Sequence, residues 1–319
     1  MPRQSANILA LIKEATLFMS EIRLSSNSLR GADLLTDILL FERTWDSTVD
    51  LQQVMVLAAD IVEKIKIEID LTETAFNRQV EAGELVIATD IIPDVFIGDT
   101  GSMTHDGAFE LLRLNTLLDQ FYIDMAFSPT PQEIPESLLN SLSYIIQYHT
   151  GEAMSMSILL NHLILETGFD CNLVVAEHEI MLRVSLSDNE YVLIDALCGE
   201  VSTYSMDGGR SVLPSGKEGA YRALDRMSVI QIFLSQQKLA FTDEGNYEQA
   251  LCCIELLIKT MPEDPYQRRD RGFLLQQLDC LKLAQDDFKF FIEQCPQDPA
   301  AQMLQMEIED FEGHEHTIH

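Results

Sequence analysis

The sequence predicts an α+β protein with a helical N-terminal region, a small core built around a short antiparallel sheet, and C-terminal helical repeats. Three observations lead to this fold class. Apolar residues recur at helical spacing through most of the chain, short alternating runs replace them in the middle, and a segment near the C-terminus occurs twice. The expected organisation is an N-terminal extension (1–30), a mostly helical region (31–135), the core (136–206), the repeat region (225–312) and a tail (313–319).

The net charge of the chain limits the kinds of molecule that it is expected to bind. The chain has 319 residues and a formal net charge of −31. Nucleic acid is therefore not expected as a partner, because binding it requires a concentrated basic surface. No Lys or Arg lies between Arg113 and Arg183. This acidic stretch either favours cationic ligands and basic proteins or serves solubility alone.

The remaining composition favours a cytoplasmic protein without a cofactor. No apolar run approaches the roughly 20 residues that span a bilayer, and the N-terminus lacks the pattern of a signal peptide. The six cysteines are therefore expected to be reduced. Neither a glycine-rich phosphate loop nor His and Cys residues at metal-ligand spacing occur, so we expect no cofactor and no metal, and a protein as the partner.

The helical elements precede the predicted sheet. Their apolar residues follow the helical period, and stretches rich in Gly, Pro and Asp separate them. Gly151 is expected to supply a turn, and Gly168 to follow the end of a helix. The expected helices are 51–69, 108–127, 137–149 and 154–168, and the expected breaks are 91–107 and 128–135.

Three strands are expected after these helices, because three short runs are rich in residues that favour strands, and the second of them alternates. The second and third form a hairpin around the sequence SDNE. The expected strands are 171–176, 179–186 and 191–197.

The stretch His149–His162 resembles the helix start that carries the nucleophile in cysteine-type acyl transfer, but Ser155 stands where a cysteine would. Such chemistry needs a nucleophile at a helix N-terminus, a His base on a neighbouring strand and a carboxylate that orients the His. Ser155, His178 and Asp195 occur in this order along the chain.

Strand register decides whether these groups can meet. A four-residue loop would pair Leu182 with Asp195, and His178 would share the face of Asp195 at roughly 13 Å along the strand. A different register would bring His178 or Glu179 opposite Asp195. Three interpretations stay open: a working triad, a serine that only caps the helix, and a displaced nucleophile at Cys171 or Cys198.

The last part of the chain contains an internal repeat. The segment GNYEQALCCIELLIKTMPEDPY aligns with DCLKLAQDDFKFFIEQCPQDPA at an offset of 34 residues, which superposes an alanine, two prolines and an aspartate. This is the tetratricopeptide period, in which helix pairs cross at a small residue and a proline follows the second helix. We expect about two repeats with flanking helices.

The densest basic cluster is QRRDRG, which contains Arg268, Arg269 and Arg271. Arginines on a repeat array can clamp a peptide carboxylate through paired hydrogen bonds. They can equally pair with the acidic middle of the chain and fix the two parts together.

Together these pieces resemble the bacterial invasion-regulator family of the Sir B type, in which a transglutaminase-like domain precedes tetratricopeptide repeats. The resemblance rests on LLDQFYIDMAF, GEAMSMSILLNHLILETGFDCNLVV, VLIDALCGE and the segment from PEDPYQRRDRG to CPQDP. It implies a cytoplasmic protein with a degenerate cysteine-protease-like core and a serine at position 155. It also implies a base nearer Glu179 than His178, and a turn whose usual proline and asparagine are absent after Asp195.

The sequence therefore predicts a non-catalytic protein-interaction or regulatory module built on a degenerate transglutaminase-like core. One alternative is a hydrolase or acyltransferase that uses Ser155, His178 and Asp195. The other is a tetratricopeptide adaptor that binds peptides through its arginines.

Overall fold

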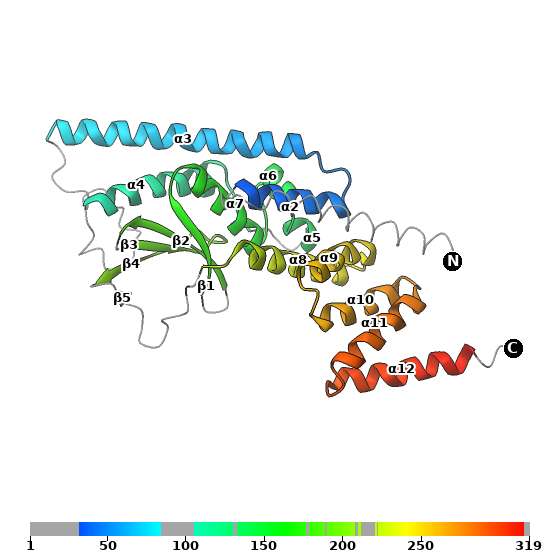
Figure 1. The fold of residues 1–319 in the computed structure, drawn as a ribbon. Coiled ribbons are helices and arrows are strands. Elements are labelled where there is room, and N and C mark those ends of the chain that lie inside the picture. The colour runs from blue at the N-terminus through cyan, green and yellow to red at the C-terminus, as the bar shows by residue number, and fades with distance from the viewer. Residues whose placement is uncertain are drawn as a thin grey trace. The chain divides into compact units, whose positions relative to one another are not determined.

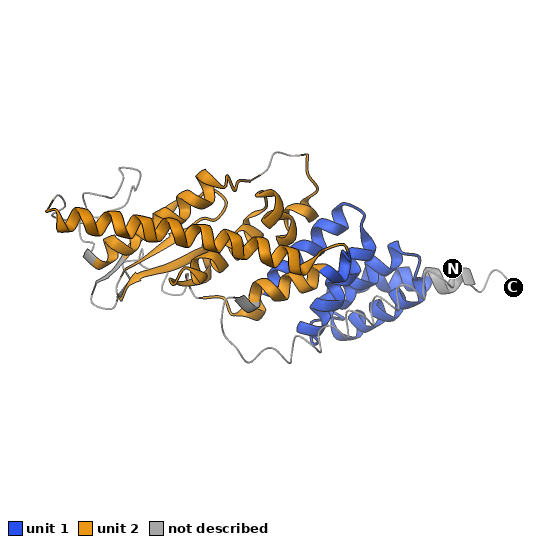
Figure 2. Cartoon of the chain, turned by 90° about the horizontal axis from the view of Figure 1, so that it is seen from above, with its two compact units in different colours: residues 1–28, 43–47, 230–319 blue, residues 29–42, 48–229 orange. Residues whose placement is uncertain are grey.

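A computed structural model describes residues 32–83, 105–129, 133–176, 179–188, 190–207, 210–211, 221 and 223–315 of the chain (Figure 1). The chain divides into two compact units (Figure 2). The sheet unit contains the described residues of 29–42 and 48–229, and the repeat unit contains those of 43–47 and 230–319. No helix in the described part of the chain is long and apolar enough to cross a membrane.

The sheet unit combines helices with an antiparallel sheet whose strands follow one another in chain order (Figure 1). The α+β prediction is therefore confirmed. The helices are most of α2 (Ala32–Trp45), together with α3 (Leu51–Glu81), α4 (His105–Asp119), the π-helix η3 (Gln120–Asp124), α5 (Glu136–Leu139), α6 (Leu142–Tyr148) and α7 (Ala153–Glu166). The strands are β1 (Asp170–Ala176), β2 (Glu179–Ser187), β3 (Glu190–Ile194), β4 (Val201–Asp207) and β5 (Arg210–Ser211).

Helix α7 packs on β1 and β2, and α4 packs on β2. One face of the β2–β3 pair is buried, because Leu182 pairs with Ile194 and Val184 with Val192, and all four are inaccessible to solvent. Burial of such aliphatic side chains stabilises a fold by roughly 1.5–3 kcal/mol each. The strand β4 was not predicted, although its sequence VSTYSMD contains residues that favour strands.

Three predicted helices differ from the structure in detail, and the one predicted over 51–69 continues to Glu81 as α3. The helix predicted over 137–149 is two short helices, because the side chain of Ser141 accepts a hydrogen bond from the backbone N–H of Tyr144 and so begins α6. The helix predicted over 108–127 is α4 followed by the π-helix η3. Gly168 follows the end of α7 with φ +97°, as its sequence position predicted.

The repeat unit contains most of α8 (Arg226–Asp243), together with α9 (Tyr247–Thr260), α10 (Pro265–Gln277), α11 (Leu281–Gln294) and α12 (Pro299–Glu315). The bounds of α9 and α11 differ by the same 34 residues that separate the two sequence segments. Asp264 and Asp298 each accept a backbone N–H at the start of α10 and α12.

Small residues allow these helices to pack closely. Ala250 and Ala284, which the alignment superposes, are both buried. A Cβ at Gly272 of α10 would lie 2.4 Å from the Phe288 ring of α11, so only glycine fits at this crossing. The repeated small residues therefore mark helix contacts, as the tetratricopeptide pattern predicted.

Candidate functional site

Ser155 is the third residue of α7 and has no exposed surface. Its hydroxyl donates a hydrogen bond to the backbone carbonyl of Asn140, with 2.5 Å between the two oxygens. The residue at the N-cap is Glu152, whose side chain makes no capping hydrogen bond. The prediction that Ser155 caps the helix is therefore wrong, because its hydroxyl binds the segment between α5 and α6 instead.

The structure describes only one of the two residues considered as the general base, His178 and Glu179. His178 lies outside the described residues. Glu179 is the first residue of β2, is exposed, and pairs with Ala176 of β1.

The register between β2 and β3 differs from the predicted one. Ser187 pairs with Glu190, but a β-bulge follows, and Leu182 then pairs with Ile194 rather than with Asp195. The predicted pairing of Leu182 with Asp195 is therefore wrong. A one-residue shift in register also exchanges the two faces of a strand. Continuing the observed register by one residue sets Asp195 level with Met181, and Glu179 then lies roughly 7 Å farther along β2 on the same face.

Asp195 lies in the turn after β3, not inside a strand as predicted. One carboxylate oxygen accepts the backbone N–H of Leu197 at 2.8 Å, and the other accepts the thiol of Cys198 at 3.2 Å. Its backbone carbonyl accepts the N–H of Gly199, which has φ +72°. Asp195 therefore stabilises its own turn, and among the described residues no hydrogen bond joins it to Ser155.

Tyr122 of η3 also holds this turn, and the sequence analysis did not identify it. Its hydroxyl donates to the backbone carbonyl of Ala196 at 2.7 Å, and a Cβ at Gly199 would lie 2.9 Å from its ring. Burial raises the pKa of Tyr122, and the nearby Asp195 and Cys198 raise it further. No local pattern links residues 122 and 196, because 74 positions separate them.

The two cysteines considered as displaced nucleophiles both keep their protons. Burial raises the pKa of Cys171 to about 12. Partial burial also raises the pKa of the exposed Cys198, and its hydrogen bond to the Asp195 carboxylate adds to this effect. Since the thiolate is the reactive form, neither position activates a thiol at neutral pH.

Three buried polar atoms around α7 have no hydrogen-bond partner in the described structure. They are Asn140 Nδ2, Ser157 Oγ and His162 Nδ1. Burial lowers the pKa of His162, the charge of Glu166 opposes this shift, and the charge of Lys66 adds to it. The neutral imidazole is therefore the form that the fold favours.

In the repeat unit, Arg271 binds two buried carboxylates. Its Nε and Nη2 donate to the two oxygens of Asp287 at 2.6 Å each, and its Nη1 donates to Glu255 at 2.7 Å. Burial alone would lower the pKa of Arg271, but the hydrogen bonds to Asp287 and the charge of Glu255 raise it. The network joins α9, α10 and α11.

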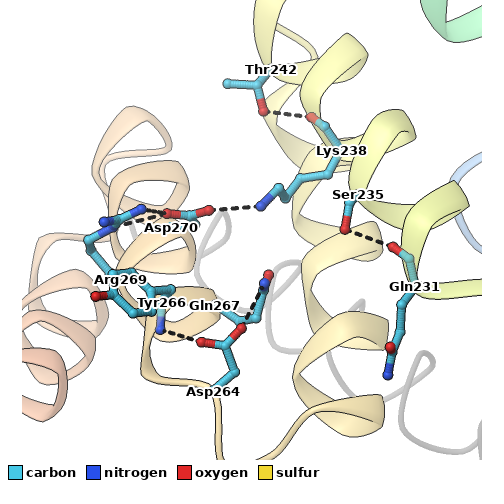
Figure 3. A network of polar contacts seen from close by, with 9 residues as sticks. All are labelled: Gln231, Ser235, Lys238, Thr242, Asp264, Tyr266, Gln267, Arg269 and Asp270. Carbon is cyan, nitrogen blue, oxygen red and sulfur yellow. Dashed lines mark hydrogen bonds and ion pairs between the residues drawn. The ribbon is translucent and has the colours of Figure 1, made fainter. Parts of the chain in front are cut away.

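The neighbouring arginines are also paired. Arg269 donates two hydrogen bonds to Asp270, which also accepts Lys238 Nζ at 2.8 Å, as Figure 3 shows. The guanidinium of Arg269 lies over the ring of Tyr266, 5.0 Å from its centroid.

Arg268 donates to Asp287 at 3.2 Å and lies over the ring of Phe290. The carboxylates that the described structure pairs with Arg268, Arg269 and Arg271 thus all belong to the repeat region. The sequence had suggested a partner peptide or the acidic middle of the chain as the binding partner of these arginines, and it had not indicated pairing within the repeat region.

No group of three His, Cys, Asp or Glu side chains within the described residues could hold a metal ion.

Comparison with known proteins assigns both parts of the chain. Residues 90–211 match the model of the transglutaminase-like superfamily, and residues 237–309 match that of the tetratricopeptide repeat. This combination supports a regulatory or interaction module. No solved structure matches the chain.

Curated relatives are bacterial. The UPF0162 protein YchA of Escherichia coli K12 is 31% identical over 212 residues, which cover 65% of this chain and 78% of the relative. A UPF0162 protein of Vibrio cholerae is 30% identical over 204 residues, covering 62% and 76%. The protein SirB1 of Salmonella typhimurium is 26% identical over 266 residues, covering 78% and 99%. The chain therefore belongs to the family of the UPF0162 and SirB1 proteins, which confirms the resemblance that its sequence motifs indicated.

Proposed function

We propose that this protein is a non-catalytic interaction module built on a degenerate transglutaminase-like core and a tetratricopeptide region. The observation that carries the proposal is the state of Ser155, whose buried hydroxyl donates to the Asn140 carbonyl. A serine nucleophile must instead donate to a base that takes its proton, and it must be reachable by substrate. A backbone carbonyl cannot act as that base.

The remaining groups of the predicted site support the same proposal. Both carboxylate oxygens of Asp195 already accept hydrogen bonds from groups of their own turn, which gives this carboxylate a structural role. The thiols of Cys171 and Cys198 stay protonated because their pKa values are raised. A cytoplasmic location, a core over 136–206 and a repeat region over 225–312 form part of this proposal.

Covalent labelling tests the proposal. We expect a fluorophosphonate probe to leave the folded protein unlabelled. In a Cys198→Ser background, the Ser155→Cys variant should react with iodoacetamide no faster than the variant that retains Ser155, because position 155 is inaccessible. Unfolding in urea should expose the new thiol and provide the positive control.

The opposite result would establish the alternative function. Fluorophosphonate labelling that maps to Ser155 and disappears in Ser155→Ala would identify a hydrolase or acyltransferase. Loss of that labelling in His178→Ala and Asp195→Ala would then assign the base and its orienting carboxylate.

A further inference from the structure

We propose that α8, α10 and α12 form a surface that binds a basic peptide segment with apolar side chains. The inference rests on the proposed interaction function and names the surface and the class of partner. It differs from a carboxylate clamp, which the arginines of α10 suggested in the sequence.

Polar contacts place the three helices side by side. Lys238 of α8 pairs with Asp270 of α10 (Figure 3). Gln276 of α10 donates to Glu307 of α12. Alternate helices of the repeat unit therefore share one surface, which we call the α8–α10–α12 face.

Large apolar side chains are exposed beside these contacts. The exposed fractions are 56% for Leu239, 41% for Phe273 and 72% for Met303. Phe273 lies one turn from both Asp270 and Gln276, and Met303 lies one turn before Glu307. Leu239 of α8 occupies the position that the repeat makes equivalent to Phe273.

The repeat explains this coincidence, because Leu239 and Phe273 differ by the 34-residue offset and thus occupy equivalent positions. Repetition places an exposed apolar group on adjacent helices of the face. Such a row offers hydrophobic contacts to an apolar segment of a partner.

The charges on the repeat unit indicate whether the bound peptide is acidic or basic. Lys238 and Arg269 share Asp270, and Arg271 is bound by two carboxylates. These ion pairs neutralise Lys238, Arg269 and Arg271, so an acidic peptide would have to displace an internal carboxylate to bind them.

Negative charge is in excess instead. Residues 230–315 contain seventeen Asp and Glu but only seven Lys and Arg. Asp243 is exposed one turn after Leu239. The complementary partner therefore presents Lys or Arg beside its apolar side chains.

Selection from a phage-displayed random-peptide library on the full-length protein tests the proposal. We expect the enriched peptides to combine Lys or Arg with aliphatic or aromatic residues. Fluorescence anisotropy with a labelled enriched peptide, at physiological ionic strength, then gives its affinity. Enrichment of acidic peptides, or of none, would overturn the proposal.

Matched variants separate this face from general attraction to an acidic protein. The double variant Leu239→Ser, Met303→Ser should weaken binding at least about tenfold, because apolar contacts dominate interface energies. The control Val56→Ser, Leu71→Ser removes comparably exposed side chains from α3 and should leave affinity unchanged. Equal affinity of the first variant and the parent would refute the assigned face.

Thermal unfolding of both variants checks that their folds are intact. Phe273 is not substituted, because its ring packs against that of Phe288 and a change there would also alter the packing of the helices. The outcome is independent of the labelling test. Reaction at Ser155 would refute the non-catalytic function whatever the peptide result. A failed peptide selection would refute the peptide-binding surface and would not affect the conclusion drawn from an unreactive Ser155.

Discussion

Ser155 near the start of α7 and Arg271 in the middle of α10 are residue types that often take part in chemistry, and their contacts differ. Ser155 makes a neutral hydrogen bond to a carbonyl fifteen positions earlier in the chain. Arg271 makes charged hydrogen bonds to carboxylates on two other helices. A serine has one hydroxyl proton, so a single bond occupies it, whereas an arginine has five donors and can join several partners.

The difference shows two ways in which a buried polar side chain finds a partner. In the sheet unit, the buried hydroxyl of Ser155 bonds to a backbone carbonyl. In the repeat unit, opposite charges neutralise each other between helices. The energies at stake differ accordingly, since an uncompensated buried charge costs more than an unpaired neutral group.

The largest effect is expected from Arg271→Met. It leaves the carboxylate of Glu255 without the guanidinium that binds it and, among the described residues, leaves Asp287 with Arg268 alone, although these side chains are only 5% and 2% exposed. The free energy of unfolding of the repeat unit should fall by about 3–5 kcal/mol. Urea unfolding followed by the fluorescence of Trp45, which contacts Phe241, measures it.

Lys282→Met is the matched control for Arg271→Met, because Lys282 is exposed and also lies in a repeat helix. It should change stability by less than about 0.5 kcal/mol. Equal losses in the two variants would contradict a buried charge network.

A smaller effect is expected from Ser155→Ala, which leaves the buried Asn140 carbonyl without this donor. The free energy of unfolding of the sheet unit should fall by about 1–3 kcal/mol. Ser157→Ala is the control, because Ser157 is equally buried in α7 but its hydroxyl has no partner in the described structure. Circular dichroism during urea unfolding compares the two, and a larger loss in Ser157→Ala would contradict the assigned role.

Tyr122→Phe removes the hydroxyl that donates to Ala196 and leaves the ring in place. We expect a loss of about 0.5–1.5 kcal/mol. Hydrogen exchange should detect faster exchange at the Leu197 and Gly199 amides, which belong to the turn that this bond holds. Unchanged exchange at both amides would show that the turn stands without Tyr122.

The smallest effect concerns pH. Because burial lowers the pKa of His162, the unfolded chain takes up a proton at higher pH than the folded chain. Its contribution to stability is therefore present above the ordinary value of 6.5 and is lost as pH falls through the lowered folded pKa. In His162→Leu the unfolding free energy should decline less between these values, as parallel urea titrations at several pH values would reveal. An identical decline in both proteins would exclude His162 as the source.

Much of the fold could be predicted from local sequence patterns. The period of 34 residues predicted the spacing of α9 and α11, and strand-like runs predicted β1, β2 and β3. The order Ser155, His178, Asp195 suggested a candidate site, but it did not predict the hydrogen bonds that Ser155 and Asp195 make. A β-bulge of one residue, which no pattern indicated, changed the pairing around Asp195.

The sequence by itself determined the fold class, the repeat and the family motifs, because these depend on periodicity and on residues close together in the chain. Only the tertiary structure decided the partners of polar groups. Asn140 binds Ser155, Asp287 binds Arg271 and Tyr122 binds the turn after β3 through contacts between separate elements. Hydrogen bonds and ion pairs depend on distance in space, which local spacing does not specify.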